Sequence, residues 1–313
     1  EGGYLPFSFD ITKYIRSENQ IHIEVYDNPR NKTLPYGKQK EKRGGMWYTP
    51  VSGIWQTVWL EFTPRTYIDS VRITPDERNR WVSFAAKVDG CTKDTVIKAQ
   101  ISKDGRIVGG ACARPTPGLT SFIADVSEAE LWEPGKPVLY DVTFTLEQNG
   151  DVTDTASSYF GFRTIEIVGD KFLINGKAVF QRTVLDQGFY PDGIYTAPTD
   201  EALEKDIDMC MELGFNGARL HEKVFEERFL YHCDRKGYMV WGEYPNWGLD
   251  HSDPLATEIY LNEWSEAVER DFNHPAIIGW CPFNETWGYF ENREKNSPLA
   301  SIYKITKKLD PTR

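Results

Sequence analysis

The pattern of hydrophobic and polar residues divides the chain into three regions. In the first, short runs such as 21–26 and 54–62 alternate between apolar and polar residues, which predicts β-strands because successive side chains of a strand face opposite sides. The second, from about residue 65 to 167, continues this alternation. From about residue 168, short apolar runs alternate with stretches of helical period, which is typical of α/β structure. The pattern therefore predicts β-structure followed by an α/β region.

The second region predicts an antiparallel β-sandwich. Its alternating runs are separated by the turn-forming pairs Asp89-Gly90, Asp104-Gly105 and Asn149-Gly150, and roughly seven strands in about 100 residues are typical of a sandwich. The first region differs, because too few strands lie within it to bury both faces of a sheet. We expect residues 1–64 to be the end of a larger β-domain.

Four βα units follow. Each strand-like run precedes a stretch with an apolar helical face, and these runs span 179–185, 216–221, 238–241 and 276–280. The first helix is expected from about Asp200 to Leu213, with Gly214 as its end. Four such units predict a parallel sheet with right-handed crossovers. Taken literally, this is an open four-stranded sheet.

Composition narrows the classes of function. The chain has 313 residues and a formal net charge of -11, and a negative protein repels the phosphate backbone of nucleic acids. No run approaches 18 consecutive apolar residues, so we expect no membrane-spanning helix. The chain begins at Glu1 and not at Met. We therefore expect the natural N-terminus to be missing, and a cytoplasmic, a periplasmic and a secreted location all stay open.

Polar and aromatic residues recur where the four strands end. The C-terminal ends of parallel strands meet at one edge of a sheet, so side chains that follow the strands are expected to lie together. The candidates for binding a substrate are Asp186, Gln187, Arg219, His221, Glu222, Glu243, Trp247, Asn284 and Trp287. A purely structural account would need a separate reason for each strand end, which favours a functional site.

Three members of this set also have structural alternatives. Arg219 is suited to orienting a carboxylate, and equally to a structural salt bridge. His221 is suited to donating a hydrogen bond to a ligand, and equally to a place in the core. Glu243 could bind a substrate or a cation, or pair with Arg219.

Glu285 is the candidate for catalysis. The apolar run 276–280 leads directly into Asn284 and Glu285, which stand between Trp280 and Trp287. A carboxyl group beside indole rings is partly removed from water, which raises its pKa, and a general acid needs a raised pKa near neutral pH. The alternative is that Glu285 only starts a loop or caps a helix.

Three motifs resemble the family 2 glycoside hydrolases, the retaining enzymes that include β-galactosidases, β-glucuronidases and β-mannosidases. The motifs are Phe272-Asn273-His274-Pro275, the pair Asn284-Glu285, and Asp310-Pro311-Thr312-Arg313. The resemblance implies that Glu285 is the acid/base and that the four βα units are the first half of an eight-unit barrel. It also implies the end of a jelly-roll sugar-binding domain over 1–64, an immunoglobulin-like β-sandwich over 65–167 and the start of a TIM barrel over 168–313.

The resemblance has implications for the reaction as well. In the family the nucleophile is a second Glu on a later strand, which would lie beyond Arg313, so we expect a fragment, truncated at both ends, that does not turn over by itself. The first choice is an exo-acting β-galactosidase-like enzyme. The stretch Leu185-Asp186-Gln187-Gly188, however, departs from the His-rich segment that well-known β-galactosidases carry, so β-glucuronides, β-mannosides and β-glucosides stay open as substrates.

Ligands and partners follow from the same resemblance. We expect a carbohydrate as the substrate, no cofactor, and no metal, because the ligand pattern for the magnesium ion that some relatives carry is not matched cleanly. A noncatalytic carbohydrate-binding or scaffold protein is the alternative from another class. A partner chain that completes the barrel, as in a homo-oligomer, is a further alternative.

A basic cluster from Lys38 to Arg43 lies in the first region. A run of charges is usually a solvated loop, which is what we expect here. Tyr36, Trp47 and Tyr48 stand near it. They could offer a ring face to a sugar or pack against the protein.

Overall fold

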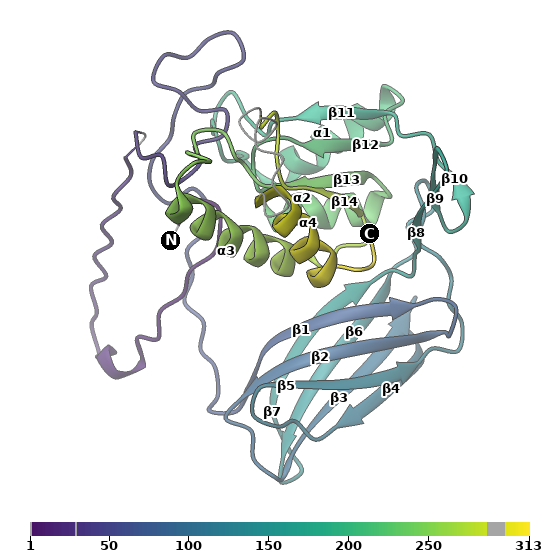
Figure 1. Cartoon of the computed structure of the whole chain (residues 1–313). Helices are drawn as coiled ribbons and strands as arrows, with labels where there is room; N and C mark the ends of the chain where they lie inside the picture. The colour runs from purple at the N-terminus through teal and green to yellow at the C-terminus, as the bar shows by residue number, and fades with distance from the viewer. Residues whose placement is uncertain (1, 29, 287–297) are drawn as a thin grey trace.

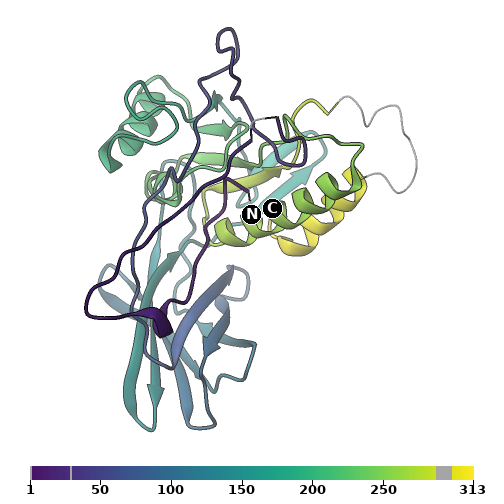
Figure 2. The ribbon, with the colours of Figure 1, turned by 90° about the vertical axis from the view of Figure 1, so that its left-hand side faces the viewer.

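The structure is a computed structural model that describes residues 2–28, 30–286 and 298–313. Figures 1 and 2 show a β-sandwich at one end of the molecule and an α/β unit at the other, joined by a small antiparallel sheet. The first 64 residues run beside both parts (Figure 1). In the part of the chain that the structure describes, none of the helices has the length and apolar character needed to cross a membrane.

The sandwich consists of two antiparallel sheets. One sheet has the order β1-β2-β5, with β1 Tyr67–Asp76, β2 Trp81–Asp89 and β5 Leu119–Asp125. The other has the order β4-β3-β6-β7, with β3 Thr95–Lys103, β4 Arg106–Ala113, β6 Tyr140–Gln148 and β7 Asp151–Phe160. The seven strands confirm the predicted sandwich. Its core lies between the sheets, where Phe84 meets Phe144 edge to face at 5.1 Å.

A three-stranded antiparallel sheet joins the sandwich to the α/β unit. Its strands are β8 Ile165–Val168, β9 Lys171–Ile174 and β10 Lys177–Ala178. Asn175 and Gly176 form the predicted turn between β9 and β10, and both have positive φ angles, 53° and 73°. Asn and Gly are the residues that tolerate this conformation best, which explains the turn.

The α/β unit confirms the predicted parallel sheet. Its strands lie in the order β11-β12-β13-β14, and they are β11 Thr183–Asp186, β12 Gly217–Leu220, β13 Met239–Glu243 and β14 Ile277–Cys281. The helices are α1 Asp200–Glu212, α2 Glu227–Lys236, α3 Pro254–Asp271 and α4 Pro298–Leu309. The first strand is shorter than the predicted run 179–185, and at the start of that run the Val179 N–H donates to the Phe172 carbonyl of β9 instead.

Local chemistry explains where the helices begin and end. The Thr199 hydroxyl accepts a hydrogen bond from the Ala202 N–H at the start of α1, and Asp253 accepts one from the Leu255 N–H at the start of α3. Helix α2 ends at Gly237, whose φ of 70° is the left-handed conformation of a typical C-terminal cap.

The strands predicted within the first region are wrong. Among the described residues before Tyr67 there is no β-strand, only one turn of 3-10 helix at Thr12–Tyr14 and isolated bridges around residues 39–48. Many apolar side chains there are exposed, including Phe9 (76%) and Phe62 (83%). Alternation makes a strand possible, but the backbone needs a neighbouring strand for its hydrogen bonds, and none lies beside these runs. The jelly-roll assignment stays a prediction.

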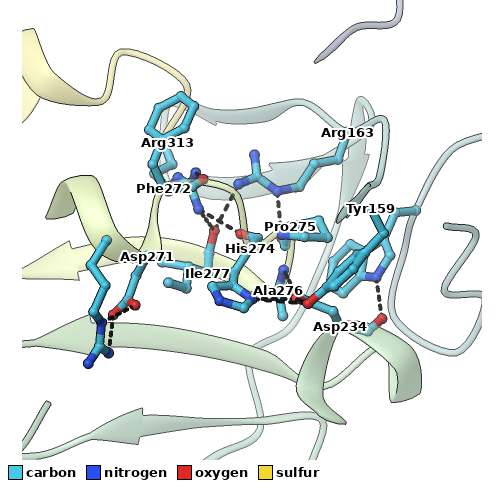
Figure 3. A network of polar contacts seen from close by, with 12 residues as sticks. Tyr159, Arg163, Asp234, Asp271, Phe272, His274, Pro275, Ala276, Ile277 and Arg313 are labelled. Carbon is cyan, nitrogen blue, oxygen red and sulfur yellow. Dashed lines mark hydrogen bonds and ion pairs between the residues drawn. The ribbon is translucent and has the colours of Figure 1, made fainter. Parts of the chain in front are cut away.

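A buried network of hydrogen bonds connects the sandwich to the α/β unit (Figure 3). Asp234 on α2 accepts hydrogen bonds from the Tyr159 hydroxyl at 2.8 Å and the Ala276 N–H at 2.7 Å, and its carboxylate lies 2.6 Å from His274 Nδ1. Arg163 donates to the carbonyls of Pro275 (2.6 Å) and Ile277 (2.9 Å). These contacts hold the N-terminal end of β14 in place.

The motif before β14 takes part in the same junction. Asn273 accepts a hydrogen bond from the Ile73 N–H at 2.8 Å and donates one to the Val71 carbonyl at 2.9 Å, so its side chain pairs with the backbone of β1. Arg313 donates to the carbonyls of Phe272 and Ile277. The Asn273 motif therefore serves the contact between the two parts, whereas Arg313 holds the segment before β14 within the α/β unit.

Candidate active site

A buried carboxylate forms the centre of the site at the C-terminal ends of β12 and β13. Glu243 Oε2 accepts a hydrogen bond from Arg219 Nε at 2.6 Å, and Oε1 accepts one from the Glu222 N–H at 2.9 Å. His221 Nδ1 lies 3.0 Å from Oε1. Burial alone would raise the pKa of Glu243, but His221 and Arg219 outweigh it and hold the pKa below its usual value. Of the alternatives for Glu243, the structure has the ion pair with Arg219.

Asn284 connects this ion pair to the end of β14. Its side chain accepts a hydrogen bond from Arg219 at 3.1 Å. Its backbone N–H donates to Asn246 Oδ1 at 2.6 Å, and its carbonyl accepts from Asn246 Nδ2 (3.1 Å) and Trp247 Nε1 (3.2 Å). Asn284 is therefore held through its backbone and its side chain at once, and this fixes where the next residue begins. Sequence reasoning missed Asn246, which has no motif of its own.

Glu285 follows at the edge of the sheet. It is solvent-exposed, so the expected burial beside indole rings is wrong for this structure. Trp280 instead packs edge to face against Trp264 and donates to Asp310 at 2.8 Å, and Trp287 lies outside the described residues. Glu285 has a φ of 46°. Such a backbone is uncommon for a residue other than Gly and is found preferentially at functional sites.

Glu222 has the same backbone conformation, with a φ of 54°. Its Oε2 accepts hydrogen bonds from the N–H groups of Asn246 (3.3 Å) and Trp247 (3.1 Å), whereas Oε1 is buried without a hydrogen-bond partner among the described residues. Burial raises the pKa of Glu222 to about 8, and the negative charge of Glu243 contributes to the rise. Glu222 is therefore mostly a neutral carboxylic acid at pH 7, with one oxygen left over for bonding.

Asp186 ends β11 beside this cluster, and its carbonyl accepts a hydrogen bond from the His221 N–H at 2.6 Å. No side-chain hydrogen bond between described residues joins Asp186 or Gln187 to Glu243 or Arg219. Asp186 accepts a hydrogen bond from the Gly188 N–H at 2.9 Å, and burial raises its pKa. The loop after β11 is held from the other side by Lys223, a buried residue that donates to the carbonyls of Gly188 (2.7 Å) and Tyr195 (2.8 Å).

Lys38 is buried at the site, although the sequence predicted a solvated side chain. It belongs to the basic cluster expected to be solvated, yet it is only 7% exposed, while Lys40, Lys42 and Arg43 are exposed as expected. Its Nζ lies 3.8 Å from the centre of the Trp247 indole. Burial lowers the pKa of Lys38, although the nearby carboxylates of Glu222, Glu285 and Glu243 act in the opposite direction.

A tight turn brings Lys38 to this place. The N–H groups of Tyr36 and Gly37 both donate to the Trp247 carbonyl, at 2.9 and 3.1 Å. Gly37 has a φ of 62°, and a Cβ atom there would lie 2.6 Å from the Glu222 carbonyl oxygen. Only glycine allows this approach. The Tyr36-Gly37-Lys38 sequence was the available signal, because a glycine beside one lysine of a charged run can mark a close contact.

Three aromatic residues of the first region, Tyr36, Trp47 and Tyr48, pack against other rings. Trp47 contacts Tyr36 and Trp247, with ring centres 6.4 and 5.1 Å apart. Tyr48 stacks on Phe189 at 3.9 Å. Rings from the first region therefore cover the loops after β11 and β13, which brings three distant parts of the chain together at one site.

Comparison with known families identifies this architecture. Residues 66–163 match the model of the glycosyl hydrolases family 2, and residues 165–313 match the model of the TIM barrel domain of that family. The chain belongs to glycosyl hydrolases family 2. The resemblance of its three motifs is thereby confirmed, and the four βα units are part of the family 2 TIM barrel domain.

Several known members of family 2 are similar to this chain. The β-glucuronidase of Rattus norvegicus is 29% identical over the whole chain, which covers 51% of that protein. The β-galactosidase of Thermoanaerobacter pseudethanolicus is 29% identical over 90% of the chain and 38% of its own length. A crystal structure of a β-glucuronidase from Bacteroides uniformis has the same fold, with a TM-score of 0.72, 22% identity, and coverage of 84% of this chain and 35% of that one. This family 2 chain spans about half of these relatives or less.

Among the residues that the structure describes, no three or more His, Cys, Asp or Glu side chains are arranged to hold a metal ion. The acidic side chains nearest to one another are already committed. Glu243 accepts from Arg219 and from the Glu222 N–H, and Glu222 accepts from two backbone N–H groups. The group available for chemistry is the exposed carboxyl group of Glu285. Hydrogen bonds to the backbone of Asn284 hold the residue before it.

Proposed function

We propose that this chain is part of a retaining β-glycosidase that hydrolyses terminal β-glucuronides, with Glu285 as the acid/base. The observation that carries the proposal is the attachment of Asn284 to Arg219, Asn246 and Trp247, which presents Glu285 at the C-terminal end of β14. Family 2 membership supports the reaction type. The sequence favoured a β-galactosidase-like substrate first, but the glucuronidase alternative has more support, because several further curated β-glucuronidases match over the whole chain.

Retention requires a second carboxylate about 5 to 5.5 Å from the acid/base. Neither of the other carboxyl groups at the site suits an attack on a sugar. Glu243 is fully buried and paired with Arg219, and Glu222 is mostly protonated at pH 7. We infer that the nucleophile comes from outside this sequence. Glu285 would then protonate the glycosidic oxygen, and after the glycosyl-enzyme has formed it would accept a proton from the attacking water.

The test uses the full natural chain that contains this sequence, beside the 313-residue chain. Both are assayed with 4-nitrophenyl β-glycosides of glucuronic acid, galactose, mannose and glucose. We expect hydrolysis of the glucuronide by the full chain and none by the 313-residue chain. Glu285→Gln should lower turnover of the full chain by about 10²- to 10⁴-fold, since a general acid/base contributes about that much.

Sodium azide separates loss of the acid/base from loss of the fold. Azide attacks the glycosyl-enzyme without needing a base, so it should restore turnover in Glu285→Gln and release a β-glycosyl azide. Preference for the galactoside would support the first expectation from the sequence instead. Binding of sugars without any hydrolysis, unchanged in Glu285→Ala, would support a noncatalytic carbohydrate-binding protein.

A further inference from the structure

Lys223 is a buried lysine that contacts three parts of the chain, and its side chain is only 1% exposed. Its Nζ donates to the carbonyls of Gly188 (2.7 Å) and Tyr195 (2.8 Å), both in the loop after β11. It also lies 3.6 Å from Glu226 Oε2 and 5.0 Å from the ring centre of Trp55, which belongs to the first region. Lysine is almost never fully buried unless it is paired. The ammonium group therefore connects the loop after β11 and the first region to the end of β12.

The backbone of the loop is shaped for a close approach to Lys223. Gly188 has a φ of 62°, and a Cβ atom there would lie 2.9 Å from both Cδ and Nζ of Lys223. Only glycine allows this conformation at this distance. The Gly188 N–H donates to Asp186 Oδ1 at 2.9 Å, while its carbonyl accepts from Lys223. Both polar backbone groups of Gly188 are thus bonded, and they fix the turn over residues 186–188.

This turn lies beside the Glu285 site. The His221 N–H donates to the Asp186 carbonyl at 2.6 Å, and His221 Nδ1 lies 3.0 Å from Glu243 Oε1. At the middle of the turn, Gln187 has a buried Oε1 without a hydrogen-bond partner among the described residues. A buried acceptor without a partner costs free energy, which a donor from water or a ligand recovers. A hydroxyl group of a bound sugar is such a donor.

We propose that Lys223 is a positioning residue, whose ammonium group fixes the turn 186–188 so that Gln187 accepts a hydrogen bond from the sugar bound at the Glu285 site. This inference rests on the proposed function, because it needs that site to bind a glycoside, but it holds for any of the candidate sugars. Lys223 acts only through the turn, since the two carbonyls, Glu226 and the surrounding rings enclose its ammonium group.

The test compares Lys223→Met with wild type in the full natural chain, using the 4-nitrophenyl β-glycoside that wild type hydrolyses best. Methionine keeps most of the apolar stem and removes the donors. At a temperature where both proteins are folded by circular dichroism, we expect kcat/KM to fall about 10- to 100-fold, mainly through KM, because a small displacement of a positioning group can cost that much. A merely structural role would lower the active fraction, and hence kcat, without changing KM. Lys205→Met, at an exposed position on α1, is the matched control.

Gln187→Ala tests the same mechanism without touching the buried lysine. We expect it to raise KM as Lys223→Met does, and adding Lys223→Met to it should raise KM by less than about twofold more, because both changes remove one interaction. An unchanged KM in Gln187→Ala would overturn the inference even if Lys223→Met did not fold. A full additional rise in the double variant would also overturn it, because Lys223 would then act on something other than Gln187.

A small amine tests whether the ammonium group itself is required. Lys223→Ala removes the side chain beyond Cβ, which is the size of an n-propylammonium ion. Added n-propylammonium chloride should lower the KM of this variant toward that of wild type, whereas 1-propanol, of similar size but uncharged, should not. Equal rescue by both would contradict a role for the charged group. A wild-type chain that hydrolyses none of the four glycosides would refute the proposed function and this inference with it, whereas an active chain whose KM ignores Lys223 would refute only the inference.

Discussion

Two buried polar clusters lie at opposite ends of β14, and they differ in what they leave unpaired. At the N-terminal end, Asp234 accepts from Tyr159 and Ala276 and contacts His274, and Arg163 donates to two carbonyls (Figure 3). At the C-terminal end, among the residues that the structure describes, Glu222 Oε1 has no hydrogen-bond partner, and Lys38 Nζ bonds to a sulfur atom and lies over the Trp247 ring. The first cluster uses its polar groups to join two parts of the protein. The second keeps groups available for a ligand.

The two clusters also differ in backbone conformation. Glu222 and Glu285, both in the C-terminal cluster, have φ angles of 54° and 46°, and such conformations cost free energy that the surrounding contacts must offset. Asp234 lies within the regular helix α2. A polar cluster with committed partners and regular backbone indicates a structural role, whereas spare donors and acceptors on strained backbone indicate a functional one.

The largest effect on stability is expected from Asp234→Ala. Removing this carboxylate leaves the buried Ala276 N–H without its acceptor and takes away the charged partner of His274 and of the Tyr159 hydroxyl, so we expect a loss of about 3 to 5 kcal/mol in the free energy of unfolding. Urea denaturation followed by tryptophan fluorescence measures this. The matched control is Asp208→Ala, a half-exposed aspartate paired with Lys236, which should cost less than about 1 kcal/mol.

The same variant separates the two clusters. At temperatures where Asp234→Ala is still folded, the ratio of kcat/KM for glucuronide and glucoside should equal that of wild type. A changed ratio would show that the junction and the site are coupled and would contradict the division between them.

An intermediate effect is expected from Glu222→Gln, and it depends on pH. The folded pKa of Glu222, about 8, is above that of an unfolded glutamate, so the folded state binds the extra proton between about pH 4.5 and 8. Its stability relative to the variant should therefore fall as pH rises through this window, by up to about 1.4 kcal/mol per pH unit. Glutamine mimics the protonated acid, so the two proteins should be equally stable below about pH 4.5.

Unfolding midpoints measured at pH 4 to 8 check this expectation. Glu258→Gln, at an exposed position on α3, should run parallel to wild type over the whole range. Parallel curves for Glu222→Gln and wild type would instead show that the pKa of Glu222 is not raised in the folded protein.

The smallest effect is expected from Arg78→Ala. Arg78 also joins the sandwich to the connecting sheet, through an ion pair with Glu166 at 3.0 Å, but its side chain is 73% exposed. Exposed pairs contribute little because water screens them, so the loss should be below about 0.5 kcal/mol by urea denaturation. A loss as large as that of Asp234→Ala would show that burial does not distinguish the two contacts.

The sequence predicted the fold well where neighbouring residues decide it. The seven strands of the sandwich, the turn at Asn175-Gly176 and the end of α2 at Gly237 all follow from local alternation, turn residues and capping. The runs 21–26 and 54–62 show the same alternation but form no strand, because a strand also requires a partner that local sequence does not specify.

The site was predicted in part. Arg219, His221, Glu222, Glu243, Trp247 and Asn284 come together as expected, since parallel strands bring their ends to one edge. Asp186 ends β11 and its backbone bonds to that of His221, but its side chain accepts from the Gly188 N–H and not from the other candidates. Asn246 and Lys38 were missed, because nothing near them in the chain shows what they contact.

The sequence by itself determined the strand and helix pattern, the parallel order of the four βα units and the position of the Asn284-Glu285 pair, because these depend on side-chain periodicity and on residues close together in the chain. Only the tertiary structure decided which charges are buried and which partner each has. Lys38 meets Trp247 across more than 200 residues, and whether its ammonium group is solvated or enclosed depends on that contact. Burial and pairing set the charge state of a side chain, so they also set what it can bind.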